Sequence, residues 1–191
     1  MKISNPEKSG ISKSKLLTME KFFEEKYIQN GKLAGIQTLV ARKGKIVHFK
    51  STGLRDVENK KKIEKDTIFR IYSMTKPITS VALMQLFEKG LFQLADPVSK
   101  FLPEFKNPRV FVSGSFPHFM TRPADRDITV RDLLTHTAGL TYGFHYRTNI
   151  DHAYRKVWTG PKGDNTDFSF PPLNLDDFSK SIASLPLEFS P

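Results

Sequence analysis

The sequence contains no cysteine, and this absence excludes disulfides, thiolate metal sites and a cysteine nucleophile. It also contains no apolar run near the roughly 18 residues that a membrane span needs, so no membrane span is expected. The opening residues, MKISNPEKSG, lack the apolar stretch of a secretory signal, which predicts a cytoplasmic location. Hydrophobic residues make up 38% of the 191 residues, enough for a folded core. A chain of this length predicts one domain, or part of a larger one.

The net charge of +10 is concentrated in the first third of the chain. Residues 1–65 carry 16 basic and 7 acidic side chains, whereas residues 66–191 carry 14 and 13. The basic residues are mostly lysines scattered along a predicted helix and hairpin, without the interleaved arginines and aromatics of a nucleic-acid surface. We therefore expect a solvated lysine-rich surface and no nucleic-acid partner, with a polyanion site as the alternative.

Hydrophobic periodicity and turn residues predict a mixture of helices and strands. A polar leader, residues 1–14, precedes them. The predicted elements, in chain order, are an amphipathic helix at 15–27, a β-hairpin of 36–41 and 45–49, an extended segment at 67–72, a buried helix at 78–89, a turn-rich stretch at 92–127, a helix at 129–139, a long surface excursion from 141 to about 175, and a short helix at 175–185.

Ser73 and Lys76 stand where the predicted extended segment meets the predicted buried helix. Three residues apart, they would share one face at the start of that helix. Pro77 prevents the helix from continuing regularly before Ser73, which puts the hydroxyl at the positive end of the helix dipole, where an oxyanion or alkoxide is favoured. Flanking Ile71 and Ile78 would desolvate Lys76 and favour its neutral amine, a competent base for a serine nucleophile.

The S-x-x-K pattern alone does not identify a catalytic site, because it occurs twice. The other pair, Ser12 and Lys15, lies in the polar leader with no strand before it. A motif is credible only in its structural setting. On local pattern alone, an ordinary helix N-cap remains open as the role of Ser73.

The residues around Ser73 resemble a known enzyme family. The stretch DTIFRIYSMTKPITSVALMQLFEKGLFQLADPVSKFLPEF, residues 66–105, resembles the nucleophile region of the serine β-lactamase-like hydrolases. It is closest to the class C β-lactamase-related esterases, a family with penicillin-binding-protein relatives and acyltransferases. A second block, residues 128–140, resembles the segment that follows in that family, and residues 35–49 with Gly53 fit its opening strands. The similarity runs from about residue 20 to the last residue.

The resemblance implies a fold and a mechanism. The fold is α/β (α+β), β-lactamase/transpeptidase-like, with an antiparallel sheet flanked by helices and a helical region. Ser73 would attack an ester or β-lactam carbonyl and form an acyl-enzyme, with Lys76 as its proton-transfer partner and the Ser73 backbone N–H as one oxyanion donor. The partner is then a small-molecule ester or β-lactam, and no cofactor is implied.

Two motifs of the family are absent from the sequence. None of the five tyrosines lies in a Y-x-N pattern, and neither K-T-G nor H-x-G occurs. The final run, residues 185–191, resembles the segment just before the family's second catalytic base. We therefore expect residues 1–191 to be the N-terminal part of a single β-lactamase-like domain whose C-terminal strands are missing. Such a part would leave a sheet edge and a face of the 78–89 helix exposed, and alone it would be poorly folded with little or no hydrolytic activity.

Other candidate residues receive structural roles. His136 could be imagined in a triad with Ser73, but the chain has no G-x-S-x-G elbow and the family gives this histidine no base role, so we predict a structural, hydrogen-bonded histidine. No metal site is predicted, because the remaining candidates lack ligand spacing: His118, His145 and His152. Four aromatics of the predicted excursion either line an acyl-binding cleft or pack the loop down: Tyr142, Phe144, Tyr146 and Trp158.

Two alternatives to the hydrolase remain open at this point. One is a non-catalytic module of the same fold, which binds a peptide, glycan or polyanion through the lysine-rich first third. The other is an acyltransferase, which uses the same acyl-enzyme with a different acceptor. Substrate identity within the hydrolase class does not follow from these residues.

Overall fold

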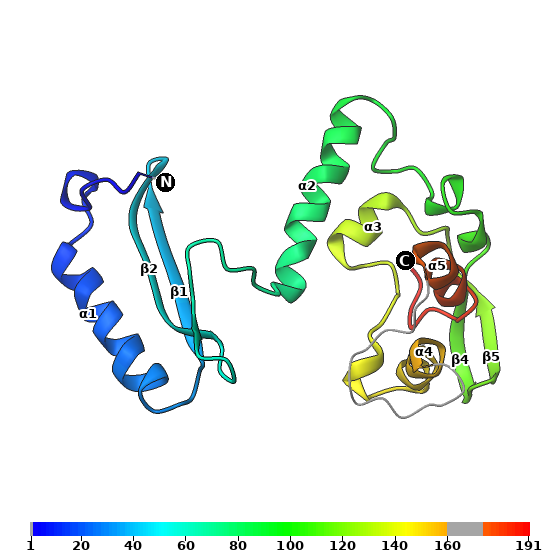
Figure 1. Ribbon diagram of the computed structural model, residues 1–191. Helices are drawn as coiled ribbons and strands as arrows, with labels where there is room; N and C mark the ends of the chain where they lie inside the picture. Colours follow the sequence, from blue (N-terminus) through cyan, green and yellow to red (C-terminus); the bar gives the residue numbers. More distant parts are fainter. Residues whose placement is uncertain (1, 160–173) are drawn as a thin grey trace. The chain divides into compact units, whose positions relative to one another are not determined.

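The computed structural model describes residues 2–159 and 174–191 (Figure 1). The chain divides into two compact units, Met1–Tyr72 and Ser73–Pro191. Each unit has its own helices and antiparallel strands. The mixed architecture confirms the predicted fold class, whereas the expectation of one domain over residues 1–191 stays a prediction. No helix in the described part of the chain is long and apolar enough to cross a membrane.

The first unit is a helix and a three-stranded antiparallel sheet in the order β1-β2-β3. Its elements are the 3-10 turn η1 (Glu7–Ser9), α1 (Lys13–Phe23), the π-helical turn η2 (Glu24–Ile28), β1 (Gly35–Arg42), β2 (Lys45–Asp56) and β3 (Lys61–Lys62).

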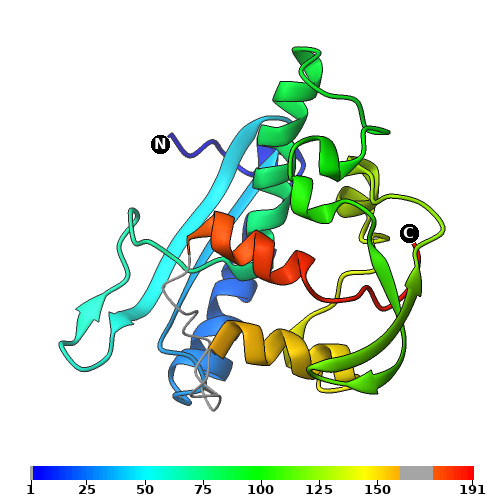
Figure 2. The same cartoon turned by 90° about the vertical axis from the view of Figure 1, so that its right-hand side faces the viewer.

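The second unit is mainly helical, with one β-hairpin (Figure 2). Its elements are η3 (Tyr72–Met74) at the boundary, α2 (Thr75–Glu88), η4 (Val98–Lys100), η5 (Pro103–Phe105), β4 (Arg109–Ser115), β5 (His118–Pro123), α3 (Val130–Thr135), η6 (Gly143–His145), α4 (Asn149–Thr159) and α5 (Leu175–Ala183).

Helix α1 confirms the predicted N-terminal helix, although it begins inside the predicted leader. Ser12 is its N-cap, and the Ser12 hydroxyl accepts a hydrogen bond from the Lys15 backbone N–H over 3.3 Å. This bond satisfies one of the donors that every helix start leaves free. The helix then continues through the π-helical turn η2.

The predicted hairpin of β1 and β2 is confirmed, including its turn. Lys43 and Gly44 both have positive φ, 49° and 70°, and Arg42 pairs with Lys45 across them. Two residues with positive φ form the type I′ turn that matches the right-handed twist of paired strands. The strands run on beyond the predicted ends, to Asp56 in β2.

A buried histidine connects α1 to this hairpin. His48 is 6% exposed, and its Nε2 lies 2.8 Å from Thr38 Oγ1 on the neighbouring strand. Its Nδ1 lies 3.4 Å from a carboxylate oxygen of Glu20 on α1. Both ring nitrogens therefore have a polar partner, which is what burial of an imidazole requires.

Two expectations for the segment around the unit boundary are wrong. No strand forms at 67–72, and Ile68 is 95% exposed, because no described strand lies beside this run to pair with its backbone. Helix α2 forms as predicted and stops before Gly90, but none of its residues is buried; Ile78 and Val81 are 63% and 60% exposed. This exposure matches the separate expectation that residues 1–191 leave a face of this helix uncovered.

The core of the second unit comes from segments far apart in the sequence. One cluster joins residues on five different segments, with Ile128 only 1% exposed: Val98, Val110, Ile128, Ala138 and Leu187. Gly139 lets the final segment pack here, because it has a φ of 78° and a Cβ would lie 2.2 Å from the Phe189 carbonyl oxygen. The last residues then pair with β4 through hydrogen bonds between Leu187 and the backbone of Arg109 and Phe111.

Helices α4 and α5 lie side by side against the β4–β5 hairpin (Figures 1 and 2). Ile150, Tyr154 and Ile182 form their buried contact. The helix predicted at 175–185 is confirmed, but α4 and the hairpin were not predicted. The expected surface excursion from 141 therefore contains a buried helix, and the turn-rich stretch 92–127 contains two strands.

Asp132 fixes the start of α3. Its carboxylate accepts hydrogen bonds from the Thr129 backbone N–H and hydroxyl, while Thr129 Oγ1 accepts one from the Asp132 N–H, a complete capping box. Arg126 donates to both carboxylate oxygens over 2.6 and 2.9 Å. These Arg126 hydrogen bonds lower the pKa of Asp132 far below its usual value, against the raising effect of burial.

Replacing Asp132 with Asn is expected to lower the free energy of unfolding at pH 7 by about 2 kcal/mol, because the charged hydrogen bonds to Arg126 are lost and the side-chain half of the capping box is weakened. The folded-state pKa is depressed, so the carboxylate's contribution is complete above the unfolded value of 3.8 and is lost as pH falls through the folded value. In urea unfolding, the gap between wild type and Asp132→Asn should therefore narrow below about pH 4.

Asp125→Asn is the matched control. Asp125 also pairs with an arginine, Arg122, over 2.9 Å, but its side chain is 71% exposed. An exposed pair contributes under about 1 kcal/mol. Equal destabilisation by the two substitutions would contradict the role assigned to Asp132.

Candidate functional site

Ser73 lies in the 3-10 turn η3, immediately before α2. The helix begins at Thr75 with Met74 as its N-cap, so it starts before the predicted range of 78–89 but does not include Ser73. Pro77 is the third helical residue, where a missing N–H costs nothing because that donor has no partner within the helix. The Ser73 hydroxyl does not cap α2. The N-cap role left open for Ser73 is therefore wrong, whereas Ser12 does cap its helix.

The backbone turns sharply just before Ser73. Tyr72 has a φ of 45°, in the left-handed region that bulky residues rarely adopt. Such a conformation costs about 1–3 kcal/mol and is typical of functional sites. The positive φ of Tyr72 thus marks the point where the irregular run at 67–71 meets the η3 turn that contains Ser73.

The side chains of Ser73 and Lys76 meet. Lys76 Nζ donates a hydrogen bond to Ser73 Oγ over 3.0 Å. In the other S-x-x-K pair, by contrast, the serine hydroxyl accepts from the backbone N–H of Lys15 and lies 2.8 Å from Ser14 Oγ. Two identical motifs thus have different geometry, and only the pair at residue 73 joins hydroxyl to amine.

The predicted desolvation of Lys76 is absent from the described residues. Ser73 and Lys76 are both exposed. Their apolar neighbours do not cover them, since Ile71 is 41% and Ile78 63% exposed. The described residues thus bring the Ser73 hydroxyl and the Lys76 amine into contact and leave both open to solvent.

An aromatic ring that sequence spacing did not connect to this site lies beside the lysine. Lys76 Nζ is 5.7 Å from the centroid of the Tyr142 ring, within range of a cation–π interaction. Phe144 and His145 stack near that ring, with centroids 4.9 and 5.3 Å away. The Tyr146 ring has a different partner, because the guanidinium carbon of Arg155 lies 4.0 Å from its centroid. The fourth predicted aromatic, Trp158, has a side chain outside the described residues.

Buried Asp151 holds the segment that carries Tyr142. It is 1% exposed and accepts hydrogen bonds from the Thr141 hydroxyl at 2.7 Å and the Arg147 N–H at 2.9 Å. The Thr148 hydroxyl in turn accepts from the Asp151 N–H, as in a helix cap. Burial raises the pKa of Asp151, but these hydrogen bonds outweigh it and leave the pKa below its usual value.

The histidines do not join the site as catalytic groups. His136 ends α3 in a left-handed conformation with a φ of 60° and is exposed, and among the described residues its side chain makes no hydrogen bond, so the predicted hydrogen-bonded role is wrong. In the described residues, no three histidine or acidic side chains lie close enough together to hold a metal ion.

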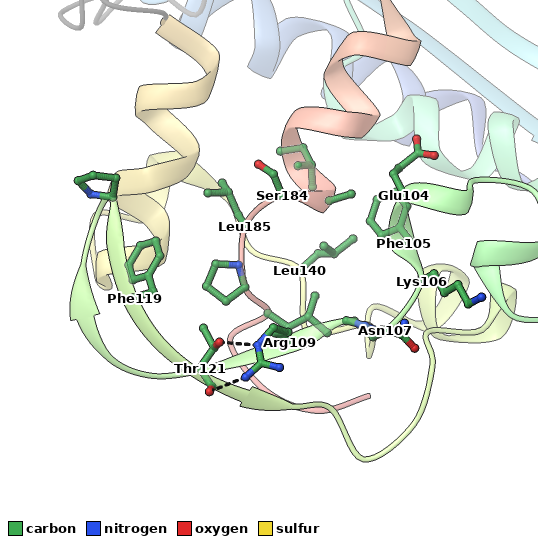
Figure 3. A pocket seen from close by; sticks show the side chains of 16 residues that line it. Glu104, Phe105, Lys106, Asn107, Arg109, Phe119, Thr121, Leu140, Ser184 and Leu185 are labelled. Carbon is green, nitrogen blue, oxygen red and sulfur yellow. Dashed lines mark hydrogen bonds between the residues drawn. The ribbon is translucent and has the colours of Figure 1, made fainter.

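A separate cavity of about 370 Å³ lies between the β4–β5 hairpin, η5 and the end of α5 (Figure 3). Arg109 lines this cavity and donates hydrogen bonds to the hydroxyl and carbonyl oxygens of Thr121, which also lines it, over 2.7 and 2.9 Å. Neither Ser73 nor Lys76 lines this cavity. It is therefore distinct from the candidate catalytic pair.

Comparisons with known proteins identify the family of the chain. The Beta-lactamase family model matches residues 21–191. Esterase EstB of Burkholderia gladioli is 34% identical over 164 residues, 86% of this chain and 37% of EstB. Acyltransferase calJ of Penicillium decumbens is 42% identical over 85 residues, 44% of this chain and 20% of calJ.

Among solved structures, EstCE1, a hydrolase with promiscuous acyltransferase activity, superposes with a TM-score of 0.70 at 27% identity. The match covers 92% of this chain and 42% of EstCE1. The chain thus spans less than half the length of these relatives. Because the family model covers nearly the whole sequence, including Ser73 and Lys76, the chain belongs to the Beta-lactamase family.

Proposed function

We propose that the protein is a serine hydrolase that acts on carboxylic esters or β-lactams through an acyl-enzyme on Ser73. The observation that carries the proposal is the 3.0 Å contact between Ser73 Oγ and Lys76 Nζ at the start of α2. Nucleophile and base within hydrogen-bond reach are the geometric requirement for this chemistry. Membership of the Beta-lactamase family and similarity to esterase EstB support it.

In the first step, Ser73 Oγ bonds to the substrate carbonyl carbon and its proton passes to the neutral amine of Lys76. The developing oxyanion is stabilised by the Ser73 backbone N–H and by the positive end of the α2 dipole. The carbonyl carbon then loses its alcohol, or the β-lactam nitrogen, which takes the proton from Lys76. In the second step, water bonds to the acyl carbon and gives a proton to Lys76, the bond between Ser73 Oγ and the acyl carbon breaks, and Lys76 returns the proton to Ser73 Oγ as the carboxylic acid leaves.

A fluorophosphonate or penicillin probe is expected to label the native protein covalently at Ser73. Labelling should be lost in Ser73→Ala, because the nucleophile is gone, and strongly reduced in Lys76→Ala, because the proton acceptor is gone. Mass spectrometry of the labelled peptide identifies the modified residue.

The second S-x-x-K pair provides the control within the same chain. Ser12→Ala and Lys15→Ala should leave labelling unchanged, because the Ser12 hydroxyl caps a helix and does not meet a lysine amine. A native protein that is folded but never labelled would contradict the proposal and favour the non-catalytic binding module.

Acyl transfer is the second candidate function. It is favoured by the similarity to acyltransferase calJ and to EstCE1, whose described activities include acyl transfer. Both reactions share the Ser73 acyl-enzyme and differ only in whether water or another nucleophile releases it. Exposure of the described pair to solvent admits either acceptor.

With a nitrophenyl ester as donor, adding a primary alcohol to the native protein is expected to yield a new ester. The ratio of ester to free acid should rise in proportion to the alcohol concentration, because alcohol and water compete for one acyl-enzyme. Product analysis by chromatography measures the ratio, with Ser73→Ala as the control. Hydrolysis that proceeds with no ester at any alcohol concentration would contradict acyl transfer.

Residues 1–191 expressed alone are expected to turn over a nitrophenyl ester little or not at all. The pair is exposed, and the sequence has no Y-x-N, K-T-G or H-x-G motif to supply the second base and the other oxyanion donor. Release of nitrophenolate measures turnover, and a thermal melt shows whether residues 1–191 are cooperatively folded. A cooperative melt combined with turnover that Ser73→Ala abolishes would contradict the expectation.

A further inference from the structure

The amine of Lys76 lies between a hydroxyl group and an aromatic ring. Its Nζ is 3.0 Å from Ser73 Oγ and 5.7 Å from the centroid of the Tyr142 ring. Within residues 2–159 and 174–191, no carboxylate forms an ion pair with Lys76. The described contacts of this amine are therefore the Ser73 hydroxyl and the ring of Tyr142.

We propose that Tyr142 is a positioning residue whose ring stabilises the ammonium that Lys76 becomes when it accepts the Ser73 proton. This inference rests on the proposed function of Ser73 and Lys76. In that step the Ser73 O–H bond breaks, an N–H bond forms on Lys76, and the oxygen electron pair bonds to the carbonyl carbon. The positive charge appears on the amine at the moment of attack.

The physical reason is that a ring face attracts a cation and has little attraction for a neutral amine. The face of an aromatic ring carries the negative part of its quadrupole. Tyr142 therefore favours the state after proton transfer over the state before it. A cation–π contact at an exposed site corresponds to a factor of about two to five in rate.

Neighbouring residues hold the Tyr142 ring in place. Phe144 and His145 pack near it, and Asp151 fixes Thr141, the residue just before it. A side chain fixed by such neighbours loses little conformational entropy when it contacts the amine. A ring fixed in this way stabilises the Lys76 ammonium without taking a proton itself.

The test is the rate at which a fluorophosphonate probe labels Ser73 across a range of pH in the native protein and in Tyr142→Leu. At high pH, where Lys76 is neutral at the start, the variant should label about two- to five-fold more slowly. The pH of half-maximal labelling should fall by about half a unit, because the variant loses the group that stabilises the ammonium.

At low pH the two profiles should converge. There Lys76 is charged both before the reaction and at the moment of attack, so the ring stabilises both states equally and its effect cancels. General structural damage would lower the rate at every pH and would not move the midpoint. The shape of the profile thus separates positioning from loss of folding.

Three further variants serve as controls. Tyr142→Phe keeps the ring face and should retain the native profile, and Tyr146→Leu, which removes a ring that contacts Arg155, should leave the midpoint in place. The titratable and charged groups near Tyr142, besides Lys76, are its own hydroxyl, His145, Arg147 with Nη2 2.6 Å from His145 Nδ1, Asp151, which accepts from Thr141, and Arg155, which donates to the Gly143 carbonyl. The difference in the pH of half-maximal labelling between the native protein and Tyr142→Leu should persist when both also carry His145→Gln.

A Tyr142→Leu profile that is lowered equally at every pH would overturn the inference, as would an unchanged profile. Either result would leave the proposed function intact provided that Ser73 is labelled and Ser73→Ala is not. Failure of the native protein to be labelled at Ser73 would instead count against the proposed function itself. The two claims can therefore fail separately.

Discussion

The position of the segment that carries Tyr142, beside the candidate site, depends on one buried carboxylate, that of Asp151. It accepts hydrogen bonds from Thr141, on one side of the Tyr142 turn, and from the backbone of Arg147 and Thr148, on the other. A buried carboxylate that satisfies this many donors converts an irregular segment into a fixed one. It also starts α4, whose Ile150 and Tyr154 build the core beneath the turn. The segment that carries Tyr142 and the core beside α4 are thus held by the same residue.

What the sequence could predict was local. The α1 helix, the Lys43–Gly44 turn and the short α5 helix all follow from spacing and turn residues within about a dozen positions. The pairing of Ser73 with Lys76 also lies within one helical turn. Each depends on neighbours in the chain, so pattern and propensity suffice.

What the sequence could not predict depends on distant partners. Helix α4 has apolar residues at helical spacing, Ile150, Tyr154 and Val157, so the sequence carries a helical signal that the predicted excursion did not use. What the sequence could not show is that Ile150 and Tyr154 pack against Ile182 of α5. The β4–β5 hairpin lies among prolines and turn residues that indicated loops. The 67–72 run has strand-forming residues but no described neighbour to pair with. The Tyr142 ring meets Lys76 across more than sixty residues, a distance that no spacing rule covers.

A lysine that serves as a base has two opposed requirements. Before reaction it must be neutral, which burial favours, and during reaction it must carry a charge, which burial opposes. In the described residues Lys76 is exposed, so the first requirement is not met by apolar cover. In our proposal the Tyr142 ring meets only the second requirement, because it stabilises the charged ammonium and not the neutral amine. A ring is a better device here than a carboxylate, since a fixed negative charge would hold the amine protonated before the attack begins, whereas the weaker pull of a quadrupole leaves the neutral form accessible.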